Sequence, residues 1–355
     1  MSTIYIRTLK HAEHTVFGVE DGQKTYFDPQ FNTSVPYSSG QQVKRSLINK
    51  LSSVLNEEQA PITFLSDITT KGEIKEGEVY GNCDPSFPDQ LFGGWMKAGK
   101  GGVARTIKRR SPLSISAMRG LHPLLAGVKK ENVTFDRTDQ PNTKFIVRDS
   151  KGNELNDDEV LALLEGKDKS LSRKWIPGNK RATGLFVQDI AIDLRRLFCV
   201  SLNSFEPELE KSEKKDTEKE LREKGWIESE NVFGKCLVAP KEERERLIPA
   251  LAEAIIDWSI TSNQSRTFSL METLAVAIGE NANKIASSIR AKLSEEEEDK
   301  AVPIIEEDID GVDVFISTTA SGYVITKSES FDAMEKAKEN LIEKMKAFDY
   351  EKQLQ

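Results

Sequence analysis

Cysteine is scarce in this sequence: Cys83, Cys199 and Cys236 lie far apart along 355 positions. An odd number of scattered cysteines is typical of reduced thiols, so the sequence excludes a disulfide framework and favours a cytoplasmic location. The spacing of the three residues also differs from that of zinc-ligand motifs. We therefore expect no structural metal site.

Long apolar runs are also absent. No hydrophobic segment approaches the length needed to cross a bilayer, and the N-terminal MSTIYIRTLK lacks the charged start and apolar core of a signal peptide. With 37% hydrophobic and 30% charged residues, the composition is that of a globular, soluble protein. The sequence thus predicts no membrane partner.

The common catalytic and cofactor motifs are missing as well. There is no G-x-G-x-x-G after an expected strand, no Walker loop, no H-E-x-x-H and no nucleophile elbow. Asp189 and Asp193 lie close together in the sequence, but no histidine or third acid accompanies them, so we interpret them as structural, salt-bridged residues. The sequence predicts no cofactor and no enzyme activity.

The most distinctive feature that is present is a basic segment without acids, here called the basic track. Residues 91–130 contain no Asp or Glu, although the chain has a net charge of −8, and they hold nine cations: Lys97, Lys100, Arg105, Lys108, Arg109, Arg110, Arg119, Lys129 and Lys130. Such a segment is typical of a surface for a polyanion, above all a phosphate backbone. The ordinary alternative is a solvated loop with spare lysines.

Charge is segregated along the rest of the chain too. Residues 206–224 and 295–310 carry most of the acidic runs, whereas 173–181 is basic. A protein with one basic and one acidic face can bind a polyanion and also stack head to tail on copies of itself.

A capped helix start is a second candidate anion site. Ser38 or Ser39 can cap a helix that begins there, which places Lys44 and Arg45 in its first turns beside unpaired backbone amides. Such a terminus is suited to phosphate. An ordinary capped helix with exposed cations explains the same residues equally well.

A third candidate combines cations with an aromatic residue. Arg173, Lys174, Lys180 and Arg181 surround Trp175. Cations can hold phosphates while an aromatic ring stacks on a base, which is how many proteins bind single strands. The alternative for a lone tryptophan is a packing anchor.

The hydrophobic pattern predicts a mixed fold. It indicates strands at 3–10, 184–202, 233–238 and 272–279, a hairpin at 312–326, and helices at 39–54, 157–164, 242–258, 281–293 and 334–348. This order favours an α+β fold over a doubly wound parallel sheet.

Three ordered segments resemble one known family. They are YSSGQQVKRSLI at 37–48, ATGLFVQDIAIDLRRL at 182–197 and SNQSRTFSLMETLAVAI at 262–278. The first is similar to a serine-rich helix start, the second to a long central strand with its following turn, and the third to a loop with a Gln-x-Arg-Thr core. Together they resemble the Cascade backbone subunit family of CRISPR effector complexes, the RAMP superfamily proteins called Cas seven. The N-terminal loop lacks that family's run of Asn-Arg-Asp.

The resemblance implies a fold and an assembly. It implies an RRM-like (ferredoxin-like) palm spanning 1–355, with an inserted helical finger region at 55–105 and a projecting β-hairpin thumb at 125–180; the charged insertion at 205–230 matches nothing in the family. It further implies a non-catalytic subunit whose copies line up head to tail along the guide crRNA, together with other Cascade subunits, and support pairing with target DNA in antiviral defence.

The same resemblance implies RNA-binding residues. The positions that match the family's guide contacts are Ser39, Lys44 and Arg45 at the helix start and Gln264 and Arg266 in the loop, with Arg109, Arg110, Met118 and Arg119 near the guide.

Two other functions stay open at this stage. Some RAMP relatives are ribonucleases, and Asp21 or Asp28, or the pair His11 and His14, could supply catalysis of RNA cleavage. A sequence-tolerant RNA-binding protein outside CRISPR is the third possibility.

Overall fold

The computed structural model describes residues 2–18, 22–75, 77–98, 106–136, 144–167, 171, 173–211, 216–260, 268–297 and 299–354, without the side chains of 131–136 and 173–179. Its main element is an antiparallel sheet with the strand order β18-β15-β1-β11-β9-β3-β2, in which β8 and β10 also pair with β11. Mixed helices and antiparallel strands confirm the predicted α+β class.

Two long strands form the centre of this sheet. β1 (Thr3–Thr15) pairs with β11 (Arg173–Asp193), and β15 (Thr273–Gly279) pairs with the other side of β1. The alternating pattern predicted the first of these strands, and the apolar run at 184–202 predicted the second. β18 (Val312–Ile316) closes one edge, and β9 (Met118–Gly120), β3 (Thr33–Ser38) and β2 (Thr25–Asp28) extend the other.

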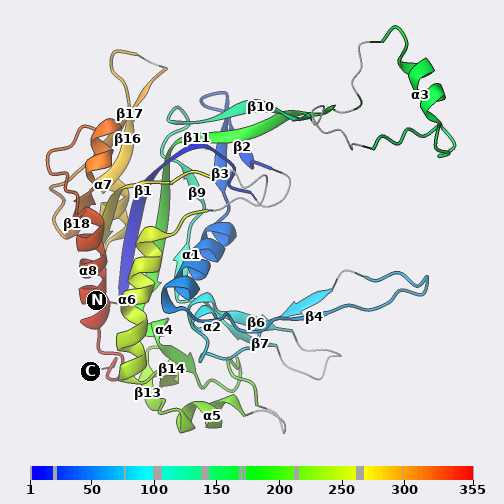
Figure 1. Cartoon of the computed structure of the whole chain (residues 1–355). Coiled ribbons are helices and arrows are strands. Elements are labelled where there is room, and N and C mark those ends of the chain that lie inside the picture. Colours follow the sequence, from blue (N-terminus) through cyan, green and yellow to red (C-terminus); the bar gives the residue numbers. More distant parts are fainter. Residues whose placement is uncertain are drawn as a thin grey trace.

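One face of the sheet carries the larger core. Ile4 and Ile6 of β1 lie opposite Ile192 and Ile190 of β11, and all four are buried. Helices α1 (Gly40–Leu55) and α6 (Lys241–Asp257) run along this face, with α8 (Ala333–Lys346) packed beside α6 (Figure 1). These three helices lie where the apolar periodicity predicted them.

The opposite face carries a smaller core. It is covered by α7 (Ala282–Ser288) and the hairpin of β16 (Ile289–Leu293) with β17 (Ala301–Ile305). Here two predictions were wrong. The helix expected at 281–293 ends at Ser288, and the hairpin expected at 312–326 is β18 followed by a 3-10 helix (Thr318–Gly322) with no return strand among the described residues.

A two-stranded ribbon continues β11 beyond the sheet. β10 (Ala126–Asp136) pairs with the first half of β11, from Ala126 opposite Gly184 to Asp136 opposite Arg173. The ribbon projects from the body, and helix α3 (Asp157–Leu164), predicted at these residues, lies beyond its far end (Figure 1). The ribbon falls within the range 125–180 expected for the thumb, but its role as a thumb stays a prediction.

The region expected to form helical fingers is mainly extended. Within 55–105 the structure has β4 (Thr63–Leu65) paired with β5 (Glu78–Tyr80), and β6 (Trp95–Lys97), which pairs with β7 (Ile107–Arg109). Apart from the end of α1, the short helix α2 (Pro88–Gly93) is its only helix in the described part of the chain.

Part of the charged insertion at 205–230 packs against the main core. It contains α5 (Thr217–Glu223) and β13 (Ile227–Asn231), and Leu221 and Trp226 are buried in the main core. β13 joins β14 (Gly234–Val238) and β12 (Cys199–Ser201) in a three-stranded sheet, which α4 (Leu194–Leu197) connects to β11. No helix in the described ranges has both the length and the apolarity that a membrane span requires.

Candidate nucleic-acid interface

The start of α1 is capped as predicted. The Oγ of Ser39 accepts a hydrogen bond from the backbone N–H of Gln42 at 3.3 Å. The next residue, Gly40, lies so close to β8 (Leu113–Ile115) that a Cβ there would be 2.7 Å from the carbonyl oxygen of Ile115. A glycine is therefore required for the helix start to lie against the loop between β8 and β9.

The two cations of the first turns have different surroundings. Arg45 is exposed, whereas Lys44 is partly buried and donates a hydrogen bond from Nζ to the carbonyl oxygen of Gly93 at 2.6 Å. Burial, assisted by the charge of Arg109, lowers the pKa of Lys44 from 10.5 to about 8. Lys44 thus fastens α1 to α2, contrary to the expected guide contact, and Arg45 is the cation that faces solvent.

This environment predicts a pH effect on stability. Because the pKa of Lys44 is about 8 in the folded protein and 10.5 without burial, the unfolded chain binds more protons between these pH values. The unfolding free energy therefore rises with pH from 8 to 10.5 and loses this gain as the pH falls again. We expect Lys44→Met to flatten that rise, measured by urea denaturation at several pH values. Parallel profiles of the two proteins would contradict the assignment.

Arg109 is not on the surface. Its guanidinium donates to the carbonyl oxygens of Leu91, of Arg196 at 2.8 Å and of Cys199 at 3.1 Å, and lies 5.5 Å from the ring centre of Trp95. The expected guide contact at Arg109 is therefore wrong, because a buried side chain that is 1% exposed cannot reach RNA. Met118 is fully buried as well, whereas Arg110 is exposed.

Three cations in the first half of the basic track face acids from a segment distant in sequence. Alternate glutamates of the 205–230 insertion face them: Glu210 accepts two hydrogen bonds from Lys97, both at 3.0 Å, Glu206 lies 3.8 Å from Lys108, and Glu208 lies 3.9 Å from Arg109. The basic track contains no acid in its sequence, but in the folded protein these glutamates lie beside it.

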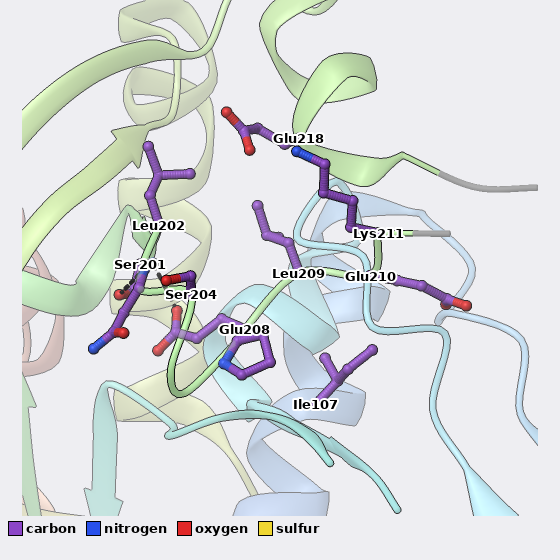
Figure 2. Close-up of a pocket in the computed structure, with 11 residues that line it drawn as sticks. Ile107, Ser201, Leu202, Ser204, Glu208, Leu209, Glu210, Lys211 and Glu218 are labelled. Atoms are coloured by element: carbon purple, nitrogen blue, oxygen red, sulfur yellow. Dashed lines mark hydrogen bonds between the residues drawn. The ribbon is translucent and has the colours of Figure 1, made fainter. Parts of the chain in front are cut away.

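Two of these glutamates, Glu208 and Glu210, also line a cavity of about 620 Å³ next to β7 (Figure 2). Its apolar lining is Ile107, Leu202, Pro207 and Leu209, and Glu208, Glu210 and Glu218 contribute carboxylates. Glu210 and Glu208 are the carboxylates that face Lys97 and Arg109, so the cavity lies beside cations that already have acidic partners.

Arg119, in the second half of the track, is held at the sheet surface by Asp189. Asp189 accepts from Arg119 Nη1 at 3.1 Å and from Arg7 Nε at 2.6 Å and Nη2 at 3.1 Å. Arg7 also donates to the carbonyl oxygens of Ala286 and Ile289, at 2.9 and 3.0 Å. Arg7 is thus fully engaged in structure, whereas the Arg119 side chain is 41% exposed.

The prediction that the two aspartates are structural is confirmed. Asp189 forms ion pairs with Arg7 and Arg119, and Asp193 lies 2.8 Å from Arg195 and caps α4.

At the base of the ribbon, cations on β10 lie directly opposite cations on β11. Lys129 lies directly opposite Arg181, and Lys130 lies directly opposite Lys180. Lys129, Lys130 and Lys180 are exposed, whereas Arg181 is buried. Like charges opposite each other on adjacent strands are destabilising, so the exposed pair Lys130–Lys180 favours a bound polyanion that compensates it.

These cations, together with Arg119, lie along the strand β11. Residues 180–189 of β11 span about 30 Å at roughly 3.3 Å per residue, and Arg119 lies opposite Val187 within this span. Because alternate residues of a strand share a face, Lys129, Arg181, Arg119 and Asp189 lie on the same side of the sheet. By the same alternation, Lys130 and Lys180 lie on the other side, and Arg181 is buried. We call the four exposed or partly exposed cations Arg119, Lys129, Lys130 and Lys180 the β11 cation row.

The remaining predicted site residues are not all placed. Arg173, Lys174 and Trp175 lie in the outer half of the ribbon, where their backbones pair with Asp136, Phe135 and Thr134 and their side chains are not described. Gln264 and Arg266 lie outside the described residues.

The residues considered for catalysis have other contacts. Asp28 accepts from the N–H groups of Gln30 and Phe31, both at 3.0 Å, and so caps a turn. His11 is buried, bonds Glu272 at 3.0 Å and stacks on Tyr323 with ring centres 4.2 Å apart. His14 is exposed, and Asp21 is outside the described residues. Among the residues that are placed, no three or more His, Cys, Asp or Glu side chains are grouped to hold a metal ion.

Sequence reasoning missed Arg7 and the alternate glutamates. The alternation in TIYIRTLK puts Tyr5 and Arg7 on one face of β1, and the spacing of Glu206, Glu208 and Glu210 gives them one side of an extended segment. Both signals were present, but neither indicates which partner faces the residues.

Comparisons with known proteins give distant structural likenesses only. No protein-family model and no curated protein sequence matches this chain. A chain of a solved structure described as "CRISPR RNA-guided surveillance complex, pre-nicking" aligns with 97% of this chain and 89% of its own length, at a TM-score of 0.43 and 10% identity. A chain of a "CRISPR RNA-guided surveillance complex" aligns with 96% and 99%, at 0.42 and 11%.

Proposed function

We propose that this chain is a non-catalytic RNA-binding subunit of a class 1 CRISPR RNA-guided complex. In this function it acts as a backbone subunit whose copies assemble along the guide crRNA and support its pairing with target DNA. The observation that carries the RNA-binding part is the β11 cation row, in which exposed lysines oppose other cations across the ribbon. The three ordered sequence resemblances support the CRISPR part.

A bound phosphate backbone would compensate the like charges that lie opposite each other on the ribbon. In the RNA-free protein, the exposed lysines Lys130 and Lys180 lie directly opposite each other, and like charges in this position repel. A phosphate backbone along this strand relieves that repulsion and releases counterions, so binding depends steeply on salt. Contacts to backbone and shape leave the bases available for pairing, as a guide requires.

Recovery of the bound RNA tests the function. We expect the chain, co-expressed with a CRISPR array and its partner subunits, to purify in a multi-copy particle with uniform guides that carry repeat-derived ends. Heterogeneous cellular RNA would instead show a general single-strand binder, and the absence of RNA would contradict both. The measurement is sequencing of the extracted RNA.

The same preparation tests the ribonuclease alternative. Alanine at His11, His14, Asp21 or Asp28 should leave the length and ends of the bound RNA unchanged, because the function proposed here contains no cleavage step. Longer RNA in any of these four variants would favour a ribonuclease.

A further inference from the structure

A second cavity lies on the sheet face that carries Lys129 and Arg119 of the β11 cation row. Its volume is about 450 Å³, within the range of about 300–1,000 Å³ that is usual for small-molecule pockets. It opens between the strands β1, β8 and β11 on one side and helix α7 on the other. We propose that this cavity receives one base of the bound RNA. The proposal rests on the proposed RNA-binding function.

The lining fits a flat, partly polar ring. Tyr5 contributes an aromatic side chain, and Ile115 and Ile285 contribute apolar surface. On the α7 side the cavity is bordered by Ala282 and Ala286, whose small, exposed side chains leave its mouth open. An aromatic ring on the open face of a sheet is a common stacking platform for single-stranded RNA.

Polar groups surround the apolar lining. Ser114 is exposed at the cavity, and Ser116 is fixed because its Oγ accepts from the backbone N–H of Asp189 at 2.9 Å. Asp189 also lines the cavity and orients Arg119, as described above. Apart from this bond to Asp189, the described residues give the Arg119 guanidinium no other hydrogen bond, which leaves donors for the phosphate next to the inserted base.

Continuity with the cation row favours RNA over a protein side chain. The cavity is lined by residues 189–191 of β11, which directly follow the segment that carries the row. A strand of RNA that follows Lys129 and Arg119 therefore arrives at the cavity mouth. An apolar side chain of a neighbouring protein would use the apolar lining but not the open donors of Arg119.

The test blocks the mouth of the cavity with a large side chain. Ala286→Phe adds an aromatic ring at the mouth, and Asn283→Phe adds the same ring to an exposed position of α7 that does not line the cavity. The probe is a set of short oligouridylates, each with 2-aminopurine at one position, titrated into the purified full-length chain. Because an aromatic platform contributes about 1–3 kcal/mol per stacked base, we expect Ala286→Phe to weaken binding about 10-fold and Asn283→Phe to match the parent.

Fluorescence gives a second readout. In the parent, 2-aminopurine is expected to be quenched by stacking at a single position of the bound oligomer, and Tyr5→Leu, which keeps apolar volume, is expected to abolish that quenching with an unchanged melting temperature. Equal affinity and quenching in the parent and Ala286→Phe would overturn the proposal. The proposal would also be overturned if Ala286→Phe bound RNA as the parent does but lost binding to a neighbouring protein.

The outcomes separate this proposal from the proposed function. Heterogeneous RNA in the recovery experiment, together with weaker binding by Ala286→Phe, would retain the base cavity and reject the CRISPR role. A parent protein that binds no oligomer at all would reject both.

Discussion

Replacing Arg109 with methionine is expected to lower the unfolding free energy by about 3–5 kcal/mol, whereas the same change at Arg110 is expected to alter it by less than about 0.5 kcal/mol. Methionine retains the apolar stem but provides no donor. The buried carbonyl oxygens of Leu91, Arg196 and Cys199 then lose their partner, and each unsatisfied group costs roughly 1–3 kcal/mol.

The Arg109 and Arg110 variants can be compared directly because the two arginines are neighbours in the chain. Arg109 is buried and Arg110 is exposed, so the substitutions differ only in environment. Urea denaturation followed by circular dichroism measures both. Equal midpoints for the two variants would show that the Arg109 side chain does not hold α2 and α4 together.

The double substitution Lys130→Ala and Lys180→Ala is expected to reduce the salt dependence of RNA binding. With two phosphate contacts removed, the slope of log affinity against log salt should become shallower by about 1.4, taking roughly 0.7 per contact on a single strand. The same change removes a like-charged cross-strand pair. The RNA-free protein should therefore be stabilised, by about 0.2–1 kcal/mol.

A matched control removes two cations from the other half of the basic track. Lys97→Ala and Lys108→Ala delete the same charge, but both lysines have glutamate partners in Glu210 and Glu206. This variant should keep the parent slope in filter-binding titrations between low and moderate salt. If both double variants lose the same slope, the basic track acts through net charge alone and the β11 cation row is not the contact surface.

The elements that could be predicted are those whose signals are local. The Ser39 cap and the stripe of Val43, Leu47 and Leu51 specify α1, and Asn156 with Glu159 forms a capping box that specifies α3. Such signals act within a few residues, so no knowledge of the rest of the fold is needed.

The site could be predicted only in part, because its electrostatics are set by distant residues. The sequence shows the basic track, yet Glu206, Glu208 and Glu210 pair with three of its cations from about a hundred positions away in the sequence. Arg109 and Arg110 are the same residue type, and only the packing of α2 against α4 decides which one is buried. Similarly, β16 was taken for a continuation of α7, because a five-residue strand whose partner β17 follows a turn has little periodicity of its own.

The position of β1 at the centre of the sheet has a consequence for synthesis of the chain. Thr3 pairs with Asp193 and Tyr5 pairs with Gly279, so both neighbours of β1 are made long after β1 itself. At about 5–20 residues per second, roughly 10–35 s pass before β11 has been translated. During this interval the apolar side chains of β1 are unprotected on the ribosome. The nascent chain is therefore expected to depend on chaperones that bind the β1 segment.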